Sequence, residues 1–289
     1  MSEQLTERLS GRLRLQAQAP ADVPLVIAIH SGTYTSAYFD LPDSSFLARA
    51  AANGVPAIAI DRPGYGGSPA LAPERMTIAD QAAYLVEPLQ ELWERHGEGR
   101  GAVLVGHSIG GAIAATIASA PGDLPVIGLA VSGVGLRTPT HHGPMWASLP
   151  DEPFVGMPAE VKNTVMFGRA GSYPDTAHAA SMGADAPTPK AELIAITGVW
   201  QQDAGNVLGR IRAPVHYRQA EHDALWIVNQ GEVDGFAAAL TASSRVDAAL
   251  VRDTGHCMDL HHVAAAFQLQ QLGFALQCGV EAEAAKRAG

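Results

Sequence analysis

The sequence predicts an α/β fold in which helices cover both faces of a mostly parallel central sheet. Two observations carry this prediction. Short continuous apolar runs, the pattern of strands buried on both faces, alternate along the chain with longer segments of helical periodicity. One such run, at residues 102–105, leads through a glycine-rich turn into an alanine-rich helical segment. Alternating strands and helices are typical of a parallel sheet, and 289 residues suffice for one large domain of this kind.

The first half of the chain supplies most of the expected sheet. Residues 12–18 alternate polar and apolar side chains, as an edge strand with one solvated face does. Continuous apolar runs predict buried strands at 25–29, 56–60, 102–105 and 126–131. We expect helices from a cap at Asp43 or Ser44 to Asn53-Gly54, from Thr77 to Gly97, and over 112–120. Pro88 lies inside the second helix and is expected to kink it.

The character of the sequence changes between residues 136 and 203. This stretch holds eight prolines and no clear strand, and it is too long for an ordinary connection. We interpret it as a cap inserted after the strand that ends near Val131, partly helical at 158–167 and 190–200. The core then comprises residues 1–135 and 204–289. Its second part is expected to contain strands at 215–218 and 246–251 and helices at 232–240 and 263–276.

The composition argues against several classes of protein. The formal net charge is -10 and no basic cluster interrupts it, which argues against binding of nucleic acid. No apolar run reaches the ~18 residues of a membrane span, and the acidic N-terminus lacks the apolar core of a secretory signal. Cys257 and Cys278 show no spacing for zinc or a disulfide framework, and the cap histidines lack metal-ligand spacing. We therefore expect a cytoplasmic protein with no metal, nucleic-acid or membrane partner.

The motif that points to chemistry is the pentapeptide Gly-His-Ser-Ile-Gly at residues 106–110. A G-x-S-x-G pattern between a strand and a helix is typical of a nucleophile elbow. Gly106 and Gly110 leave room for the strand and the helix to approach closely, and Ser108 is lifted out of the sheet at the apex of the turn. The N–H groups that begin the next helix are available to an oxyanion. The alternative is a glycine-rich turn that carries a solvent-facing serine.

Further short motifs, in their order and spacing, resemble the α/β-hydrolase superfamily over nearly the whole chain outside the cap. They are the elbow, residues 30–32 (His-Ser-Gly), residues 61–68 (similar to D-x-P-G-x-G-x-S), residues 221–223 (Glu-His-Asp) and residues 255–256 (Gly-His). The resemblance implies an α/β-hydrolase fold with an inserted cap. It also implies a catalytic serine, an acid and a histidine in that chain order. Ser108, Asp223 and His256 satisfy this order.

The resemblance also implies the role of each residue. His256 follows a strand and a turn, so it is expected at the carboxyl edge of the sheet, where a neutral imidazole can take the proton of Ser108. Asp223 would fix the tautomer of His256 and stabilise its charged form. Glu221 is the rival acid. Residues 132–134 (Ser-Gly-Val), where some members carry the acid, offer no carboxylate here, which favours Asp223.

The oxyanion hole is expected to use the N–H of Ile109, just after the nucleophile, and one N–H from the loop after His30. Ser31 stands where relatives commonly have glycine. Gly32 aligns with the usual donor, but Ser31, Gly32 and Thr33 all stay open. Cys257, beside His256, is expected to be a packed thiol.

The hypothesis for function is a cofactor-free serine hydrolase that forms an acyl-enzyme with a small-molecule ester, thioester or lactone. The cap would select an apolar acyl or aromatic group, with His107, Trp146, Met166 and Trp200 as candidate substrate-binding residues. The same triad also serves C–C cleavage, lyase and cyclisation chemistry. A further alternative, from another class, is a ligand-binding pseudoenzyme or receptor. The sequence does not indicate an oligomeric state.

Overall fold

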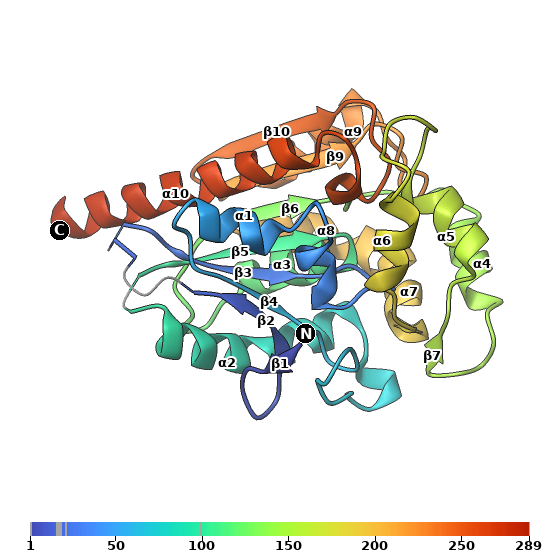
Figure 1. Ribbon diagram of the computed structural model, residues 1–289, viewed down its shortest axis with the longest axis horizontal. Coiled ribbons are helices and arrows are strands. Elements are labelled where there is room, and N and C mark those ends of the chain that lie inside the picture. Colours follow the sequence, from blue (N-terminus) through green and yellow to red (C-terminus); the bar gives the residue numbers. More distant parts are fainter. Residues whose placement is uncertain (1, 16–18, 21, 99, 289) are drawn as a thin grey trace.

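A computed structural model of the chain describes residues 2–15, 19–20, 22–98 and 100–288 (Figure 1). Its centre is an eight-stranded sheet in which the two pairs at the N-terminal edge, β1 with β2 and β2 with β4, are antiparallel and the remaining pairs are parallel. Across the sheet the strands are β1 (Glu3–Gln4), β2 (Ser10–Arg14), β4 (Ala57–Ile60), β3 (Leu25–Ile29), β5 (Ala102–His107), β6 (Val126–Ser132), β9 (Val215–Ala220) and β10 (Val246–Val251).

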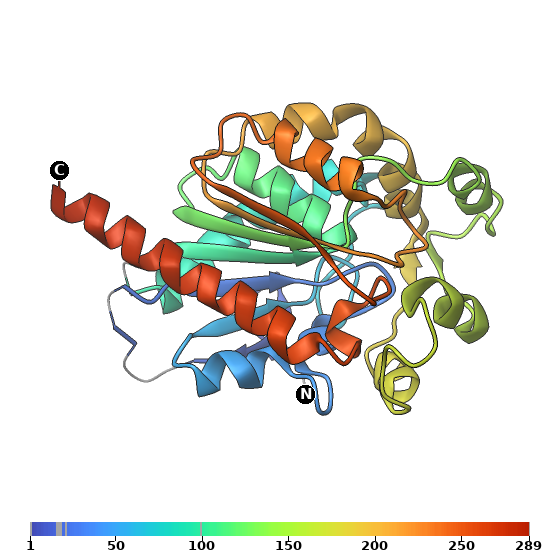
Figure 2. The ribbon, with the colours of Figure 1, turned by 90° about the horizontal axis from the view of Figure 1, so that it is seen from above.

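Helices cover both faces of this sheet, and the long α10 runs diagonally across one face beside α1 (Figure 2). That face carries α1 (Phe46–Ala52) and α10 (Ala264–Ala288). The opposite face carries α2 (Ile78–His96), α3 (Ile109–Ser119), α8 (Val199–Gly209) and α9 (Gln230–Ala239). Short 3-10 helices occur at η1 (Ser36–Asp40), η2 (Pro73–Arg75) and η3 (Met258–Leu260).

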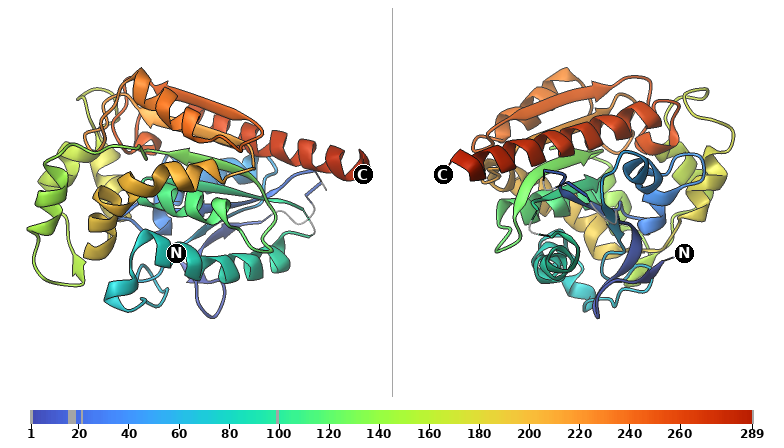
Figure 3. Two further views of the ribbon diagram at one scale, coloured as in Figure 1. Left: turned by 180° about the vertical axis from the view of Figure 1, so that it is seen from behind. Right: turned by 60° about the vertical axis from the view of Figure 1, so that its left-hand side comes forward.

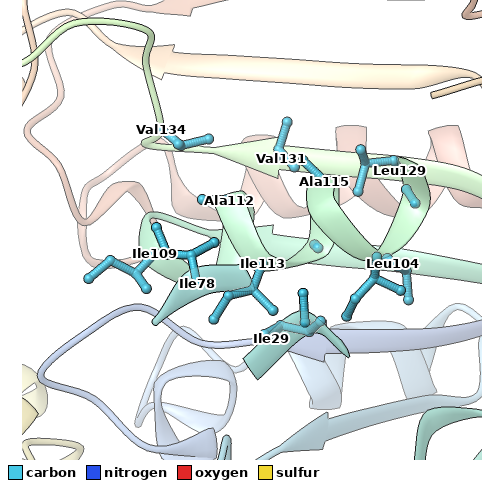
Figure 4. Packing of buried hydrophobic residues seen from close by; sticks show 14 of the residues in the cluster. Ile29, Ile78, Leu104, Ile109, Ala112, Ile113, Ala115, Leu129, Val131 and Val134 are labelled. Atoms are coloured by element: carbon cyan, nitrogen blue, oxygen red, sulfur yellow. The ribbon is translucent and has the colours of Figure 1, made fainter. Parts of the chain in front are cut away.

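Two hydrophobic cores lie on the two faces of the sheet. In β3, Ile27 and Ile29 belong to the core beneath α2 and α3, whereas Val26 and Ala28 belong to the core beneath α1 and α10. Figure 4 shows Ile113 of α3 close to the side chains of the strands in the first of these cores. Because successive side chains of a strand point to opposite faces, a strand buried on both faces must be apolar throughout. This explains the continuous apolar runs.

The expected fold class is confirmed, and the differences lie at the ends of elements. Thr77 caps α2 as predicted, and Pro88 lies inside α2, which is assigned as a single helix from Ile78 to His96. The cap of α1 is Ser45, whose hydroxyl accepts from the N–H of Ala48 at 2.9 Å, and not Asp43 or Ser44. The edge strand β2 begins before residue 12 and ends at residue 14, and residues 16–18 of the expected strand lie outside the described residues. The last helix extends twelve residues beyond its expected end at 276.

The segment expected to form the cap lies at the end of the sheet toward which the parallel strands point (Figure 1). It holds α4 (His142–Ala147), α5 (Ala159–Met166), α6 (Ala177–Gly183) and α7 (Lys190–Thr197). No strand was expected here, yet β7 (Phe154–Val155) and β8 (Thr188–Pro189) pair as a short antiparallel ribbon. The expected boundary at 203 falls inside α8, which packs against α3 of the core (Figure 3). Within the described residues, no helix is both long and apolar enough to cross a membrane.

Candidate active site

Ser108 stands in a strained turn between β5 and α3. Its φ of 55° and ψ of -125° lie in a region that residues with side chains rarely adopt, and such strain persists only where the surroundings enforce it. A Cβ at Gly106 would come within 2.6 Å of the carbonyl oxygen of Gly110, and a Cβ at Gly110 within 2.2 Å of that of Ile29. The motif glycines are therefore required by the close approach of strand, helix and neighbouring loop, as predicted.

Asp223 and His256 form a buried pair. The Nδ1–H of His256 donates to Oδ2 of Asp223 at 2.7 Å, and both side chains are fully buried. The carboxylate is held by Gln219, whose Nε2 donates to Oδ2 at 2.9 Å, and by the N–H of Leu225, which donates to Oδ1 at 2.9 Å. With Nδ1 as the donor, the free lone pair of His256 lies on Nε2. That nitrogen bonds to none of the described residues, so it is open to act as a base.

Glu221 lies in a different environment from Asp223. Its carboxylate accepts from the Arg252 guanidinium at 2.5 Å and from the N–H of Asp253 at 2.8 Å. These bonds lower the pKa of Glu221 below its usual value, and the backbone N–H of Asp253 has the larger effect. The structure therefore pairs His256 with Asp223 and leaves Glu221 in a surface ion pair.

Gly133 brings the elbow and the His256 ring to the same place. Ser132 precedes Gly133 in the chain, and its carbonyl accepts from the N–H of Ser108 at 2.8 Å. A Cβ on Gly133 would lie 3.2 Å from Cε1 of His256, and its φ of 61° also favours glycine. No hydrogen bond joins His256 Nε2 to Ser108 within the described chain. Such bonds are often long without substrate and tighten when substrate binds.

The loop after β3 holds the three candidates for the second oxyanion donor, and one of them is already hydrogen-bonded. The N–H of Thr33 donates to the hydroxyl of Thr188 at 2.5 Å, so it is already used. Ser31 and Gly32 remain as the candidates for the second donor. Gly32 lies against the nucleophile turn, since a Cβ there would come within 3.0 Å of Cδ1 of Ile109. The N–H of Ile109 itself belongs to the first turn of α3, whose N–H groups have no acceptor within the helix.

A small cavity of about 40 Å³ lies beside Ser108, and apolar side chains from the cap form much of its wall. Its lining includes Ser31, Gly32, Thr33, Ser108, Ile109, Thr138, His142, Trp146, Met157, Met166, Leu193, Ile196, Thr197, Leu225 and Trp226. A second, larger cavity of about 230 Å³ is lined by cap residues, with Thr33 as its one described wall residue from the core. The two share Thr33, Trp146, Met157 and Leu193 in their walls, so these side chains separate neighbouring spaces.

Two of the four expected substrate-binding residues, Trp146 and Met166, line the cavity beside Ser108, and the other two do not. Trp200 is buried in the core beside α3, where its Nε1–H donates to the carbonyl of Gly135 at 2.9 Å. The expectation for Trp200 was wrong because α8 belongs to the layer that packs on the sheet.

His107 was also expected at the substrate, and it lies beneath the turn instead. Its ring stacks on Tyr38 with centroids 5.0 Å apart, and Nδ1 is 3.1 Å from the hydroxyl of Ser132. Burial, and then the neighbouring His256, lower the pKa of His107 well below its usual value. His107 is the last residue of β5, and its buried side chain packs under the elbow against Tyr38 and Ser132.

Sequence reasoning missed several residues of the cavity wall. The polar ones are Thr138, His142 and Thr197, and Trp226 and Leu225 follow Asp223 closely in the chain. Burial, and then the neighbouring His141, lower the pKa of His142, which favours its neutral form. The proximity of Trp226 to Asp223 in the sequence was a usable signal. Among the described residues, no three His, Cys, Asp or Glu side chains are grouped to hold a metal ion.

Cys257 lies next to His256 and is fully buried. Burial raises the pKa of its thiol to about 12, and Sγ lies 3.5 Å from the hydroxyl of Tyr34. A thiol that stays protonated is a poor nucleophile, which agrees with the packed thiol expected from the sequence.

Comparison with known proteins places the chain in a family. Residues 26–268 match the alpha/beta hydrolase family, so the chain belongs to it. The match begins in β3 and ends in α10, and it therefore spans the elbow, the cap and the segments that carry Asp223 and His256. None of the curated proteins compared matches the chain.

Solved structures share the fold at low sequence identity. A lipase-esterase related protein from Clostridium acetobutylicum has a TM-score of 0.70 at 15% identity, with 92% of this chain and 99% of that chain covered. A monoacylglycerol lipase from Paleococcus ferrophilus has a TM-score of 0.69 at 14% identity, covering 94% and 99%. An enol-lactonase from Burkholderia xenovorans has a TM-score of 0.67 at 15% identity, covering 92% and 96%. At these identities the likeness extends to the fold alone.

Proposed function

We propose that this chain is a serine hydrolase that forms an acyl-enzyme on Ser108 with a small-molecule ester, thioester or lactone. One observation carries the proposal: the buried pair of Asp223 and His256 lies next to the strained elbow that presents Ser108 to an apolar cavity. Membership of the alpha/beta hydrolase family supports the reaction class. Fold alone does not fix the reaction, which depends on the side chains of this site.

The proposed reaction follows from the roles of the three side chains. Oγ of Ser108 attacks the acyl carbon while its proton passes to Nε2 of His256, and Asp223 stabilises the imidazolium that forms. The N–H of Ile109 and one from the loop after β3 bind the oxyanion. The intermediate then expels the alcohol or thiol, which takes the proton from His256. Water then gives a proton to His256 and attacks the acyl carbon, the carboxylic acid leaves, and His256 returns the proton to Oγ of Ser108.

The two cavities support an apolar acyl or aromatic group as the part of the substrate that the cap selects. The space beside Ser108, about 40 Å³, is smaller than the roughly 150 Å³ cavity known to hold benzene. It accepts a short acyl group. A longer chain or a ring reaches the apolar cavity of about 230 Å³ if the shared wall at Trp146 and Met157 moves aside. Thr138, His142 and Thr197 are the polar cap residues in this wall that remain for the rest of the substrate.

The test is a pre-steady-state assay with p-nitrophenyl acetate and butyrate. We expect a burst of one p-nitrophenolate per chain, followed by steady turnover, because acylation and deacylation are separate steps. A fluorophosphonate probe should label Ser108, as mapped by mass spectrometry, and should not label Ser108→Ala. A burst without turnover would indicate a receptor that traps its ligand. Absence of both burst and labelling, or labelling at Cys257, would overturn the proposal.

A further inference from the structure

A fully buried ion pair joins the core to the cap near the site. Arg62 follows β4 in the core, and Glu192 lies in α7 of the cap. The guanidinium and the carboxylate meet in a bidentate pair, with Nη1–Oε2 at 2.6 Å and Nη2–Oε1 at 3.0 Å, and neither side chain is exposed to solvent. Tyr65 donates to Oε1 at 2.5 Å and Gln81 to Oε2 at 2.8 Å, so both carboxylate oxygens carry two bonds.

Arg62 also donates to Oε1 of Gln81 at 2.7 Å, and its two other remaining donors hold the loop proposed to supply the oxyanion N–H. We call residues 30–33 the oxyanion loop. Nε of Arg62 donates to the carbonyl of His30 at 3.0 Å, and Nη2 to the carbonyl of Ser31 at 3.2 Å. The His30 ring adds to the same arrangement: its Nε2 accepts from the N–H of Arg62 at 3.1 Å and its Nδ1 donates to the Ser31 carbonyl at 2.7 Å. Two consecutive carbonyls are therefore fixed.

Fixing these carbonyls also fixes the two candidate donors. In a trans peptide the C=O and the N–H point in opposite directions, and the described chain has no cis peptide bond. The carbonyl of His30 shares its peptide with the N–H of Ser31, and the carbonyl of Ser31 shares its peptide with the N–H of Gly32. Because Arg62 draws both carbonyls to one side, both N–H groups are turned to the other side.

The cap also holds the end of the oxyanion loop directly. The N–H of Thr33 donates to Thr188 at 2.5 Å, and its carbonyl accepts from the N–H of Ala186 and from Nζ of Lys162, each at 3.0 Å. Thr33 has a φ of 62°, which is unfavourable for a β-branched residue. Contacts from the cap thus enforce a backbone conformation that the loop would not keep by itself.

Stability alone is a weak reason for a buried ion pair, because the loss of hydration offsets much of the attraction between the charges. Replacing a buried ion pair by a well-packed hydrophobic pair of similar volume is often neutral or stabilising. The bonds from Arg62 to two backbone carbonyls are what such a pair would lack. They indicate a role in positioning.

We propose that Arg62 and Glu192 are positioning residues that hold the oxyanion loop in its donor conformation, so that seating of the cap completes the oxyanion hole. The proposal rests on the proposed hydrolase function. In this arrangement Glu192 acts through Arg62 and touches no substrate. Displacement of the cap from its seat would release both the Arg62 clamp and the Thr33 contacts, and the enzyme would lose transition-state stabilisation along with its substrate pocket.

The experiment compares wild type, Glu192→Gln and the double variant Arg62→Met/Glu192→Met in the full chain. For each we would measure kcat and KM on p-nitrophenyl butyrate, the Ki of a butyl trifluoromethyl ketone whose adduct with Ser108 carries an oxyanion, and the melting temperature. Loss of one oxyanion donor typically lowers kcat by about 10²–10³. We expect both variants to lose about 10- to 100-fold in kcat and in affinity for the ketone, with KM within about threefold of wild type, because only the transition state uses the hole.

The double variant separates positioning from folding. We expect it to fold, since no charge is left unpaired, and still to react slowly. Asp247→Asn is the control: it removes the negative charge that pairs with Arg218 at the β10 edge of the sheet, where Oδ2 lies 2.9 Å from Nη2, and should leave kcat unchanged. Recovery of kcat together with stability in the double variant would overturn the proposal. If that variant does not fold, Glu192→Gln decides: an unchanged kcat and ketone Ki would overturn it.

Failure of the proposed function gives a different result. In that case wild type itself shows no burst and no labelling of Ser108. An active, labelled wild type with wild-type-like variants refutes the positioning role alone.

Discussion

The core and the cap hold their functional side chains in different ways. In the core, Ser108, Asp223 and His256 follow β5, β9 and β10, and parallel strands bring their carboxyl ends to one edge of the sheet. The cap consists of short helices and a two-residue ribbon, joined by proline-rich segments. It is tied to the core by buried polar contacts such as the pair of Arg62 and Glu192. The regularity of the sheet thus positions the proposed catalytic residues, whereas individual tertiary contacts position the cap.

The largest expected effect comes from removing the proposed nucleophile in the core. Ser108→Ala should lower kcat by about 10⁶ and leave the fold intact, with about 10³–10⁴ over the uncatalysed rate remaining from binding and the oxyanion hole. The measurement is kcat on p-nitrophenyl butyrate, with circular dichroism to verify the fold. If Ser108→Ala keeps more than a hundredth of the wild-type kcat, another group is the nucleophile.

The second prediction tests whether Asp223 or Glu221 orients His256. Asp223→Asn keeps the shape of the site but favours the wrong tautomer of His256, and in a related triad this change costs about 10⁴ in kcat. The matched control is Glu221→Gln, two residues away in a surface ion pair with Arg252, which should change kcat by less than about twofold. Reversed effects of the two substitutions would assign the acid to Glu221.

This contrast explains what the sequence could predict. The places of Ser108, Asp223 and His256, the proposed triad, were predictable because each follows a recognisable strand and because their order along the chain fits the family. Glu192 carries no such signal, since its role depends on α7 facing Arg62 across the cap boundary. Trp200 was misplaced for the same reason: an aromatic residue in a helix can face the core or the cavity, and only packing decides.

The third prediction concerns the core alone and describes how its stability depends on pH. His216 in β9 is buried, and neither ring nitrogen bonds to any residue that the structure describes. Burial, and then the charge of Arg218, lower the pKa of His216 to about 4. The unfolded chain therefore takes up a proton near pH 6.5 while the folded chain does not, so protonation favours unfolding and stability falls as the pH drops from 6.5 to 4.

His216→Leu should remove this part of the acid sensitivity. The measurement is the free energy of unfolding of both proteins, by urea titration at each pH. The value for the variant minus the value for wild type should increase by about 1–3 kcal/mol as the pH is lowered from 7 to 4. Burial, and then the charge of Arg62, lower the pKa of His30 to about 3. His30 therefore contributes to the acid sensitivity of both proteins equally. A pH-independent difference between the two proteins would show that His216 is not the group that titrates.

The smallest expected effect belongs to the cap. Met157 is half-buried and lines both the cavity beside Ser108 and the larger apolar cavity, so its side chain forms part of the wall between them. Met157→Ala removes most of that side chain and should join the two spaces. A buried methylene contributes about 0.8 kcal/mol, so each carbon that enters the larger cavity should raise kcat/KM about three- to fourfold until the space is filled.

The measurement is kcat/KM for p-nitrophenyl esters from acetate to decanoate. Wild type should peak at a short chain, because only about 40 Å³ lies open beside Ser108, and Met157→Ala should move the peak to longer chains. Met182→Ala is the matched control: Met182 is also a cap methionine, but it is 44% exposed and lies in neither cavity wall. Its profile should follow wild type. Identical profiles for Met157→Ala and wild type would mean that this part of the cap does not select the acyl chain. The selectivity would then belong to the walls that Met166 and Trp226 form nearer the nucleophile.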